Sequence, residues 1–76
     1  MVVDRPLSFD LPRQRATLEP AGPGVIFSLD AGRAGGSRTT LGVGDIGSSS
    51  GPDGRFSFSV TGLDDQGRPV FRLARA

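Results

Sequence analysis

The side chains able to do chemistry in this sequence are few, because histidine, cysteine, lysine, tyrosine and tryptophan are all absent. General bases and nucleophiles are therefore restricted to Asp, Glu, Ser and Thr. No serine has an evident base beside it in the sequence. We therefore predict that the chain is not an enzyme on its own. We also expect no catalytic residue, no cofactor and no metal site, since His and Cys are missing for zinc.

The segment 32–40, Gly-Arg-Ala-Gly-Gly-Ser-Arg-Thr-Thr, combines three glycines with two arginines. Glycines expose backbone N–H groups and arginines pair with phosphate, so the segment has the composition of an anion site. It lacks the lysine, the spacing and the following helix of a phosphate-binding P-loop. We interpret it as a connecting loop, and anion or nucleic-acid contact through Arg33 and Arg38 is the alternative.

Three aspartates, Asp53, Asp64 and Asp65, lie beside glycine-containing turns. Paired carboxylates can perform acid–base work or hold a divalent cation. Their spacing matches no calcium-binding loop, and Asp with Gly is the composition that turns favour. The pattern therefore predicts turns at these positions.

The charges are evenly mixed along the chain. Nine arginines and eight acidic residues give a net charge of +1, without the clustering usual in nucleic-acid-binding proteins. Arg55, Arg72 and Arg75 are expected together at one end of a hairpin, as a solvated face or a partner contact. With the two loop arginines they form the candidate partner-contact set, which is Arg33, Arg38, Arg55, Arg72 and Arg75.

The clearest structural signal is a C-terminal β-hairpin. Residues 55–61 and 69–75 carry apolar side chains at alternate positions, the period of a strand with one buried face. A loop over 64–67 sets the register. The expected facing pairs are Val60 with Phe71, Phe58 with Leu73, Phe56 with Arg75, Thr61 with Val70, Ser59 with Arg72 and Ser57 with Ala74.

Details of this hairpin follow from single residues. Gly67 suits the left-handed conformation at the end of the loop, and Asp64 can accept backbone hydrogen bonds at its start. Pro69 lacks an N–H group, which favours an edge strand.

Shorter strands are expected before the hairpin. The segment 7–11 alternates between two prolines and predicts an edge strand, and 15–19 is a weaker candidate ended by Pro20. The segment 25–29 is apolar enough to be a strand that is buried on both faces or that lies where the sheet curls. A short strand is also considered at Val2 and Val3.

The middle of the chain is rich in glycine. A strand over 41–46 would place its glycines on one face, with Leu41 and Val43 inward and room for a close approach. The flanking segments 30–40 and 47–54 are predicted to be loops. With 12 glycines and six prolines, no helix is expected.

These elements predict a single small domain over 1–76. We expect an all-β fold, a small antiparallel barrel or sandwich of five or six short strands. The expected core is formed by Leu7, Phe9, Leu11, Leu18, Ile26 or Phe27, Leu29, Leu41, Val43, Phe56, Phe58, Val60, Phe71 and Leu73.

The size of the chain bears on its function. A domain this small buries only about 60% of its unfolded surface, so self-association or docking is a natural source of stability. We predict a non-catalytic structural or protein-interaction module, a small component of a multi-copy assembly such as a viral or phage-like particle. The alternative is a small nucleic-acid- or anion-binding barrel that uses the five arginines, with affinity that falls steeply with salt. The sequence does not distinguish a structural module of this kind from an accessory subunit or inhibitor of an enzyme.

The location is predicted from hydropathy. No stretch of 18 apolar residues occurs, and the start of the sequence lacks a charged segment followed by an apolar one. We expect neither a transmembrane segment nor a signal peptide, and a soluble protein that is cytoplasmic or particle-associated.

Overall fold

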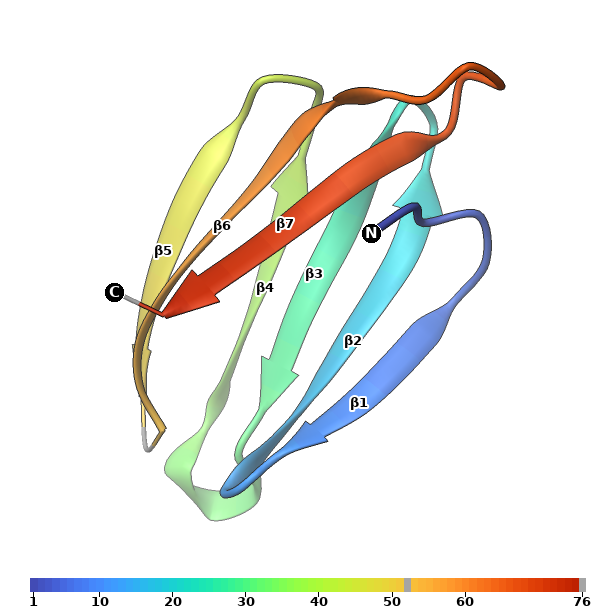
Figure 1. Ribbon diagram of the computed structural model, residues 1–76. Coiled ribbons are helices and arrows are strands. Elements are labelled where there is room, and N and C mark those ends of the chain that lie inside the picture. Colours follow the sequence, from blue (N-terminus) through green and yellow to red (C-terminus); the bar gives the residue numbers. More distant parts are fainter. Residues whose placement is uncertain (52, 76) are drawn as a thin grey trace.

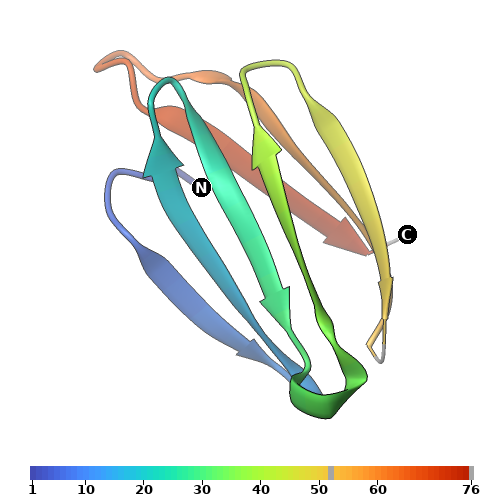
Figure 2. The ribbon, with the colours of Figure 1, turned by 180° about the vertical axis from the view of Figure 1, so that it is seen from behind.

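The computed structural model describes residues 1–51 and 53–75, with the backbone alone at residue 34. Seven antiparallel strands form two sheets that pack face to face (Figures 1 and 2). The first sheet has the order β1 (Leu7–Leu11), β2 (Gln14–Ala21), β3 (Gly24–Asp30) and β4 (Gly36–Leu41). The second has the order β5 (Ile46–Gly51), β6 (Gly54–Leu63) and β7 (Pro69–Arg75).

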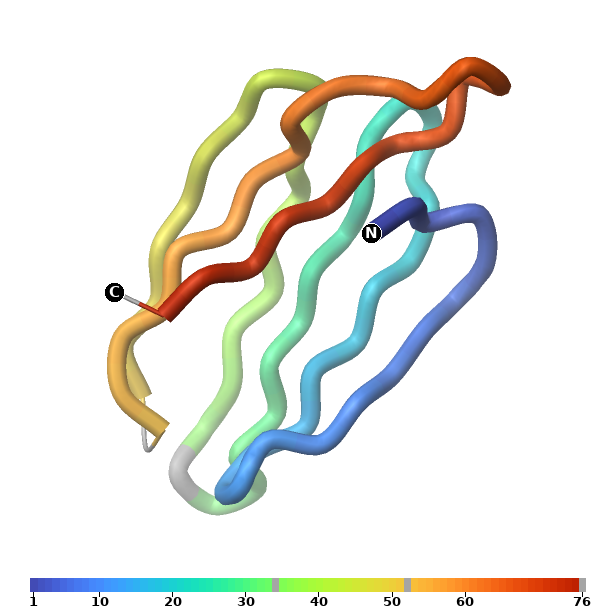
Figure 3. Tube along the Cα trace, viewed as in Figure 1, coloured from blue at the N-terminus to red at the C-terminus, as the bar shows by residue number. Residues whose placement is uncertain are grey.

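The predicted all-β fold is confirmed, and the sandwich is the better of its two descriptions because the two sheets do not close into a barrel. Each strand pairs with its neighbour in the sequence except at the passage from β4 to β5, where the chain changes sheet. The trace in Figure 3 follows this path from end to end. Seven strands replace the expected five or six, because two segments predicted to be loops are strands.

The segment 30–40 is the first of these corrections. It contains a 3₁₀ turn at Gly32–Ala34 and then the strand β4, whose residues pair in register with β3. Ser37 faces Leu29 and Arg38 faces Ser28. The polar, glycine-rich composition of this segment is typical of a loop, so the strand was not predicted. β4 is stabilised mainly by ladder hydrogen bonds to β3 rather than by its own side chains.

The segments 41–46 and 47–54, predicted to be a strand and a loop, also differ from the prediction. Residues 42–45 form a tight turn between the sheets, not a strand, and β5 then runs through the predicted loop and turns into β6 at Gly54. The Asp45 carboxylate accepts a hydrogen bond from the Gly42 N–H at 2.8 Å, and Gly44 has a φ of 88°, which favours glycine. Pro52 of the predicted loop lies outside the described residues.

The N-terminal strands agree closely with the sequence. β1 has the predicted bounds and lies at a sheet edge. β2 continues through Pro20 instead of ending there. Because the first residue of β1, Leu7, lies opposite Leu18, β2 has only β3 as a neighbour at Pro20, and a strand tolerates proline where one edge is unpaired.

The β6–β7 hairpin confirms the predicted register from Phe56 to Val60. The pairing of Thr61 with Val70 is wrong, because a bulge after Val60 places Gly62 opposite Val70. Gly67 has the expected positive φ of 77°. Pro69 begins an edge strand, as predicted, and Val2 bridges to Val70 on that edge.

The core lies between the two sheets and is centred on Phe27 of β3. Its ring centroid lies 4.7 Å from that of Phe58 on β6 and 5.2 Å from that of Phe71 on β7, so three aromatic rings join the sheets. The buried apolar residues are Val3, Ala16, Leu18, Val25, Phe27, Leu29, Leu41, Phe56, Phe58, Val60 and Phe71. Leu7, Phe9, Leu11 and Leu73 pack against this core and are partly buried.

Two core predictions are wrong. Val43 is 49% exposed, because it lies in the turn between the sheets rather than on a strand. β3 is not buried on both faces: Phe27 and its alternate neighbours point inward, whereas Ile26 is only half-buried on the outer face. Val3, Ala16 and Val25 are core residues that the sequence pattern did not single out.

Candidate functional site

The five candidate arginines lie on separate surfaces. Arg55 and Arg72 share the outer face of β5–β7, with the serines Ser57 and Ser59. Arg38 lies on the outer face of the other sheet, and Arg33 is in the 3₁₀ turn. The structure therefore does not bring the five together.

Arg75 is not on the outer face, where the hairpin prediction grouped it with the other two. It follows Phe71 and Leu73 at alternate positions, and its guanidinium carbon lies 5.7 Å from the centroid of the Phe56 ring. This is within the range of a cation–π contact, which covers one end of the core.

None of these five arginines forms an ion pair with the described residues. The ion pairs that occur there involve other arginines, such as Arg15 with Asp10 at 3.1 Å and Arg68 with Asp64 at 2.7 Å. The strand residues on the outer face of β5–β7 include no acidic side chain. This face therefore presents two uncompensated cations.

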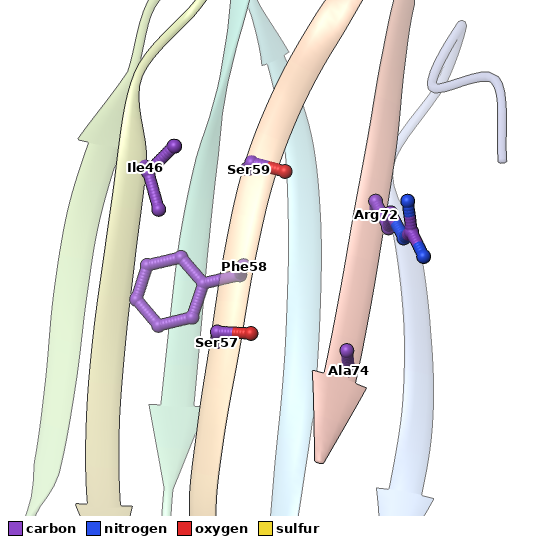
Figure 4. Close-up of a pocket in the computed structure, with 6 residues that line it drawn as sticks. All are labelled: Ile46, Ser57, Phe58, Ser59, Arg72 and Ala74. Atoms are coloured by element: carbon purple, nitrogen blue, oxygen red, sulfur yellow. The ribbon is translucent and has the colours of Figure 1, made fainter. Parts of the chain in front are cut away.

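A hollow of about 290 Å³ lies on the β5–β7 sheet (Figure 4). It is lined by Ile46, Ser57, Phe58, Ser59, Arg72 and Ala74. The small serine and alanine side chains in the middle leave room between Ile46 on one strand and Arg72 on another. The outward side chains of this sheet include Ile46, Ser48, Arg55, Ser57, Ser59, Arg72 and Ala74, and we call them the β5–β7 outer face, whereas Phe58 points into the core.

Gly47 shapes the inner side of this sheet. It faces Phe58 across the β5–β6 ladder, and a Cβ at Gly47 would meet atoms of the Phe58 ring at 3.0 and 3.2 Å. A close approach is expected at the glycines of 41–46. It occurs instead at Gly47, the second residue of β5. The absence of a side chain here lets the Phe58 ring lie against β5 and reach Phe27.

The glycine-rich segment 32–40 is not a cradle of free N–H groups. The Gly32 N–H donates to the Asp30 carboxylate at 2.8 Å, and the Gly35 N–H donates to the Gly32 carbonyl at 3.0 Å. The Ala31 N–H donates to the Gly35 carbonyl at 2.8 Å. These donors are occupied within the turn, and the rest of the segment belongs to β4.

Asp64 organises the β6–β7 turn, as predicted for a turn aspartate. Its Oδ1 accepts hydrogen bonds from the backbone N–H groups of Gln66 at 3.0 Å and Arg68 at 2.8 Å. Its Oδ2 lies 2.7 Å from the Arg68 guanidinium. The Arg68 backbone N–H, above all, holds the pKa of Asp64 below its ordinary value of 3.8, helped by the Arg68 side chain and the Gln66 N–H and opposed by partial burial.

Replacing Asp64 with alanine is therefore expected to lower the melting temperature at neutral pH. Because the folded-state pKa is depressed, the carboxylate stabilises the fold above its ordinary pKa, and this stability is lost as pH falls through the lower folded-state value. The difference from wild type should shrink below about pH 3.8. Thermal melts followed by circular dichroism from pH 7 to pH 2 measure it.

Asp65→Ala is the control for this prediction. Asp65 lies in the same turn, and its side chain accepts none of these hydrogen bonds. An equal loss in both variants, or a difference from wild type that persists at low pH, would contradict the role assigned to Asp64.

Three of the strands pair on one side only. β1 and β4 are the edges of the first sheet, and β5 is an edge of the second. β7 is also an edge, but residues at the start of the chain cover part of it: the Phe71 N–H donates to the Met1 carbonyl at 2.7 Å and the Val3 N–H donates to the Pro69 carbonyl at 2.9 Å. Unpaired strand edges are templates for pairing with another chain.

Comparison with protein-family models, with curated proteins and with solved structures finds no match. The site is therefore argued from the geometry of this chain alone. Within residues 1–51 and 53–75, no helix is long and apolar enough to cross a membrane. The same residues include no group of three or more His, Cys, Asp or Glu side chains placed to share a metal ion.

Proposed function

We propose that this chain is a non-catalytic structural or protein-interaction module that acts as a small component of a multi-copy assembly, such as a viral or phage-like particle. The observation that supports the proposal is the composition of the β5–β7 outer face. Ile46 is 79% exposed there, more than any other large apolar side chain of the described residues. A strand that exposes an isoleucine to this degree loses the free energy that its burial would contribute, about 1.5–3 kcal/mol.

The arginine and the lack of acidic residues near Ile46 match the composition of protein–protein contacts, whereas the neighbouring serines and alanine do not. Interfaces are enriched in arginine and depleted in aspartate and glutamate relative to the rest of a protein surface. Arg72 borders the same hollow as Ile46, and small side chains between them leave space for a partner's side chain. Association would also supply stability that a thin core of this size lacks.

The test is the mass of the protein in solution, by sedimentation or light scattering over a series of concentrations. We expect a defined oligomer or growth with concentration, which Ile46→Ser weakens. Val43→Ser is the matched control, because Val43 is a half-exposed apolar residue in the neighbouring turn. A monomer at every concentration would contradict self-assembly, and equal effects of the two variants would contradict the role of the β5–β7 outer face.

Nucleic-acid or anion binding is the less favoured proposal. Arg55 and Arg72 support it, because they share a face without acidic side chains. Arg33, Arg38 and Arg75 lie elsewhere, so the five cannot contact one short ligand at once. Binding of a labelled single-stranded DNA that falls steeply with salt would favour this proposal over the first.

A further inference from the structure

The free edge of β5 can be read from its hydrogen bonds to β6. The Val60 N–H donates to the Asp45 carbonyl at 3.2 Å, so the backbone of residue 45 faces β6. Alternate residues of an antiparallel strand direct their backbone groups to opposite sides. Gly47 and Ser49 therefore also face β6, whereas Ile46, Ser48 and Ser50 direct their N–H and C=O groups away from it.

The other open edges carry features that oppose pairing with a second chain. β1 carries Asp10 and lies between Pro6 and Pro12 in the sequence. β4 carries Arg38. β7 begins at Pro69, has two arginines and is partly covered by the start of the chain. Charged residues, proline and covering segments are the means by which natural proteins block strand edges.

Within its six residues β5 has none of these features, and one proline, Pro52, follows it in the sequence. Its six residues, Ile-Gly-Ser-Ser-Ser-Gly, include no charge and no proline. Its side chains are also small apart from Ile46, so they leave the backbone of the edge accessible. Among the described strands, β5 is the edge that remains open to pairing.

We propose that two copies of this chain pair through β5, antiparallel and around a two-fold axis at Ser48. This inference rests on the proposed function and identifies the partner as a second copy. The axis at Ser48 uses all three outward-facing residues: Ile46 of one copy faces Ser50 of the second copy, and the two Ser48 residues face each other. Each facing pair exchanges two backbone hydrogen bonds, so the two three-stranded sheets become one continuous sheet.

A second copy suits this edge, because β5 carries no charge that would repel its own copy across a two-fold axis. A charged partner strand would find no opposite charge on β5. The β5 strand of a second copy is itself a neutral edge strand. The nearest cations do not oppose the pairing. Arg55 lies on β6 opposite Ser50, and its Nε donates to the Ser50 hydroxyl at 3.5 Å, so its charge lies over β5. In the pair the two Ser50 residues are four positions apart along the strand, about 13 Å, which exceeds the screening length of about 8 Å at physiological salt.

The paired edge is short, so the expected dimer is concentration-dependent rather than permanent. Ser48→Lys and Ser48→Glu test it, because each variant would place two like charges opposite each other at the axis. We expect each variant alone to dimerise at least about tenfold more weakly than wild type by sedimentation. An equimolar mixture of the two should restore dimerisation, since opposite charges then face each other.

Ser8→Lys is the matched control, because Ser8 is an exposed serine on the edge strand β1. It should dimerise like wild type. Association that survives in both Ser48 variants would overturn the β5 interface and leave the proposed function standing. A wild type that stays monomeric would overturn both.

A second measurement does not depend on the folding of any variant. In the wild type, hydrogen exchange followed by NMR reports on the outward N–H groups of Ile46, Ser48 and Ser50. They should exchange rapidly in dilute protein and become protected as concentration rises, whereas Ser8 should not change. Protection that does not depend on concentration would overturn the interface.

Discussion

Replacing Phe27 with alanine is expected to remove a large share of the folding stability, about 3–5 kcal/mol. Phe27 is 1% exposed and contacts the rings of Phe58 and Phe71 from the opposite sheet. Truncation of a buried phenylalanine costs about 3–5 kcal/mol through lost burial and the cavity left behind. A domain of 76 residues has only about 4–11 kcal/mol of total stability.

Chemical denaturation and thermal melting at a fixed protein concentration measure this effect. If some folded protein remains, the melting temperature should fall by at least about 12 °C. Ile26→Ala is the control: Ile26 is the next residue of β3, but it is half-buried on the outer face. It should lose clearly less stability. Equal losses in the two variants would contradict the assignment of Phe27 to the junction of the sheets.

Replacing Gly24 with alanine is expected to destabilise the fold by about 3 kcal/mol, at the upper end of the range for overpacked sites. A Cβ at Gly24 would overlap the carbonyl oxygen of Leu41 and lie 2.9 Å from its carbonyl carbon and 3.0 Å from the Gly42 Cα. All three are backbone atoms, so no side chain can rotate away. The start of β3 and the end of β4 must then separate.

Gly62→Ala is the control for steric overlap. A Cβ there meets nothing within 4 Å, and Gly62 does not have a positive φ. This variant should be neutral or slightly stabilised, because alanine restricts the unfolded chain. Urea denaturation of both variants makes the comparison. A Gly24→Ala variant as stable as Gly62→Ala would show that the two strands do not approach as closely as described.

Local patterning was sufficient to predict the C-terminal hairpin. The phenylalanines and leucines of β6 and β7 alternate strictly, so a slip of one residue would turn them outward, and the register from Phe56 to Val60 follows. The bulge after Val60 was not predictable. It lies where the alternation of apolar side chains has ended, so the side-chain pattern does not set the register there.

Local patterning failed for β4 and β5. Segments such as Gly-Ser-Arg-Thr-Thr and Gly-Ser-Ser-Ser-Gly have weak strand propensity and no apolar face, so they resemble loops. They are strands because β3 and β6 offer them unpaired backbone groups along a whole edge. Gly47 adds a further reason, since only a residue without a side chain allows the Phe58 ring to lie against β5.

The candidate site likewise has residues that the sequence suggests and an arrangement that only the fold reveals. The sequence singled out five arginines as candidate contacts, but neither their ion pairing nor their grouping follows from it. Arg55 and Arg72 are 17 positions apart in the sequence and share a face because the ladder places both on the outer side of β5–β7. Ile46 is the last residue of the expected strand 41–46, and its exposure appears only once the turn at 42–45 is known.

The sequence by itself determined the all-β class, the β1 strand, the final hairpin and most of the core, because side-chain periodicity and turn chemistry act over a few residues. Tertiary structure decided which glycine- and serine-rich segments are strands, where the chain changes sheet and which strand edges stay open. These depend on hydrogen bonds and contacts between residues distant in the sequence. The β5 edge and the β5–β7 outer face belong to this second group, because a free surface is defined only by what the rest of the fold leaves uncovered.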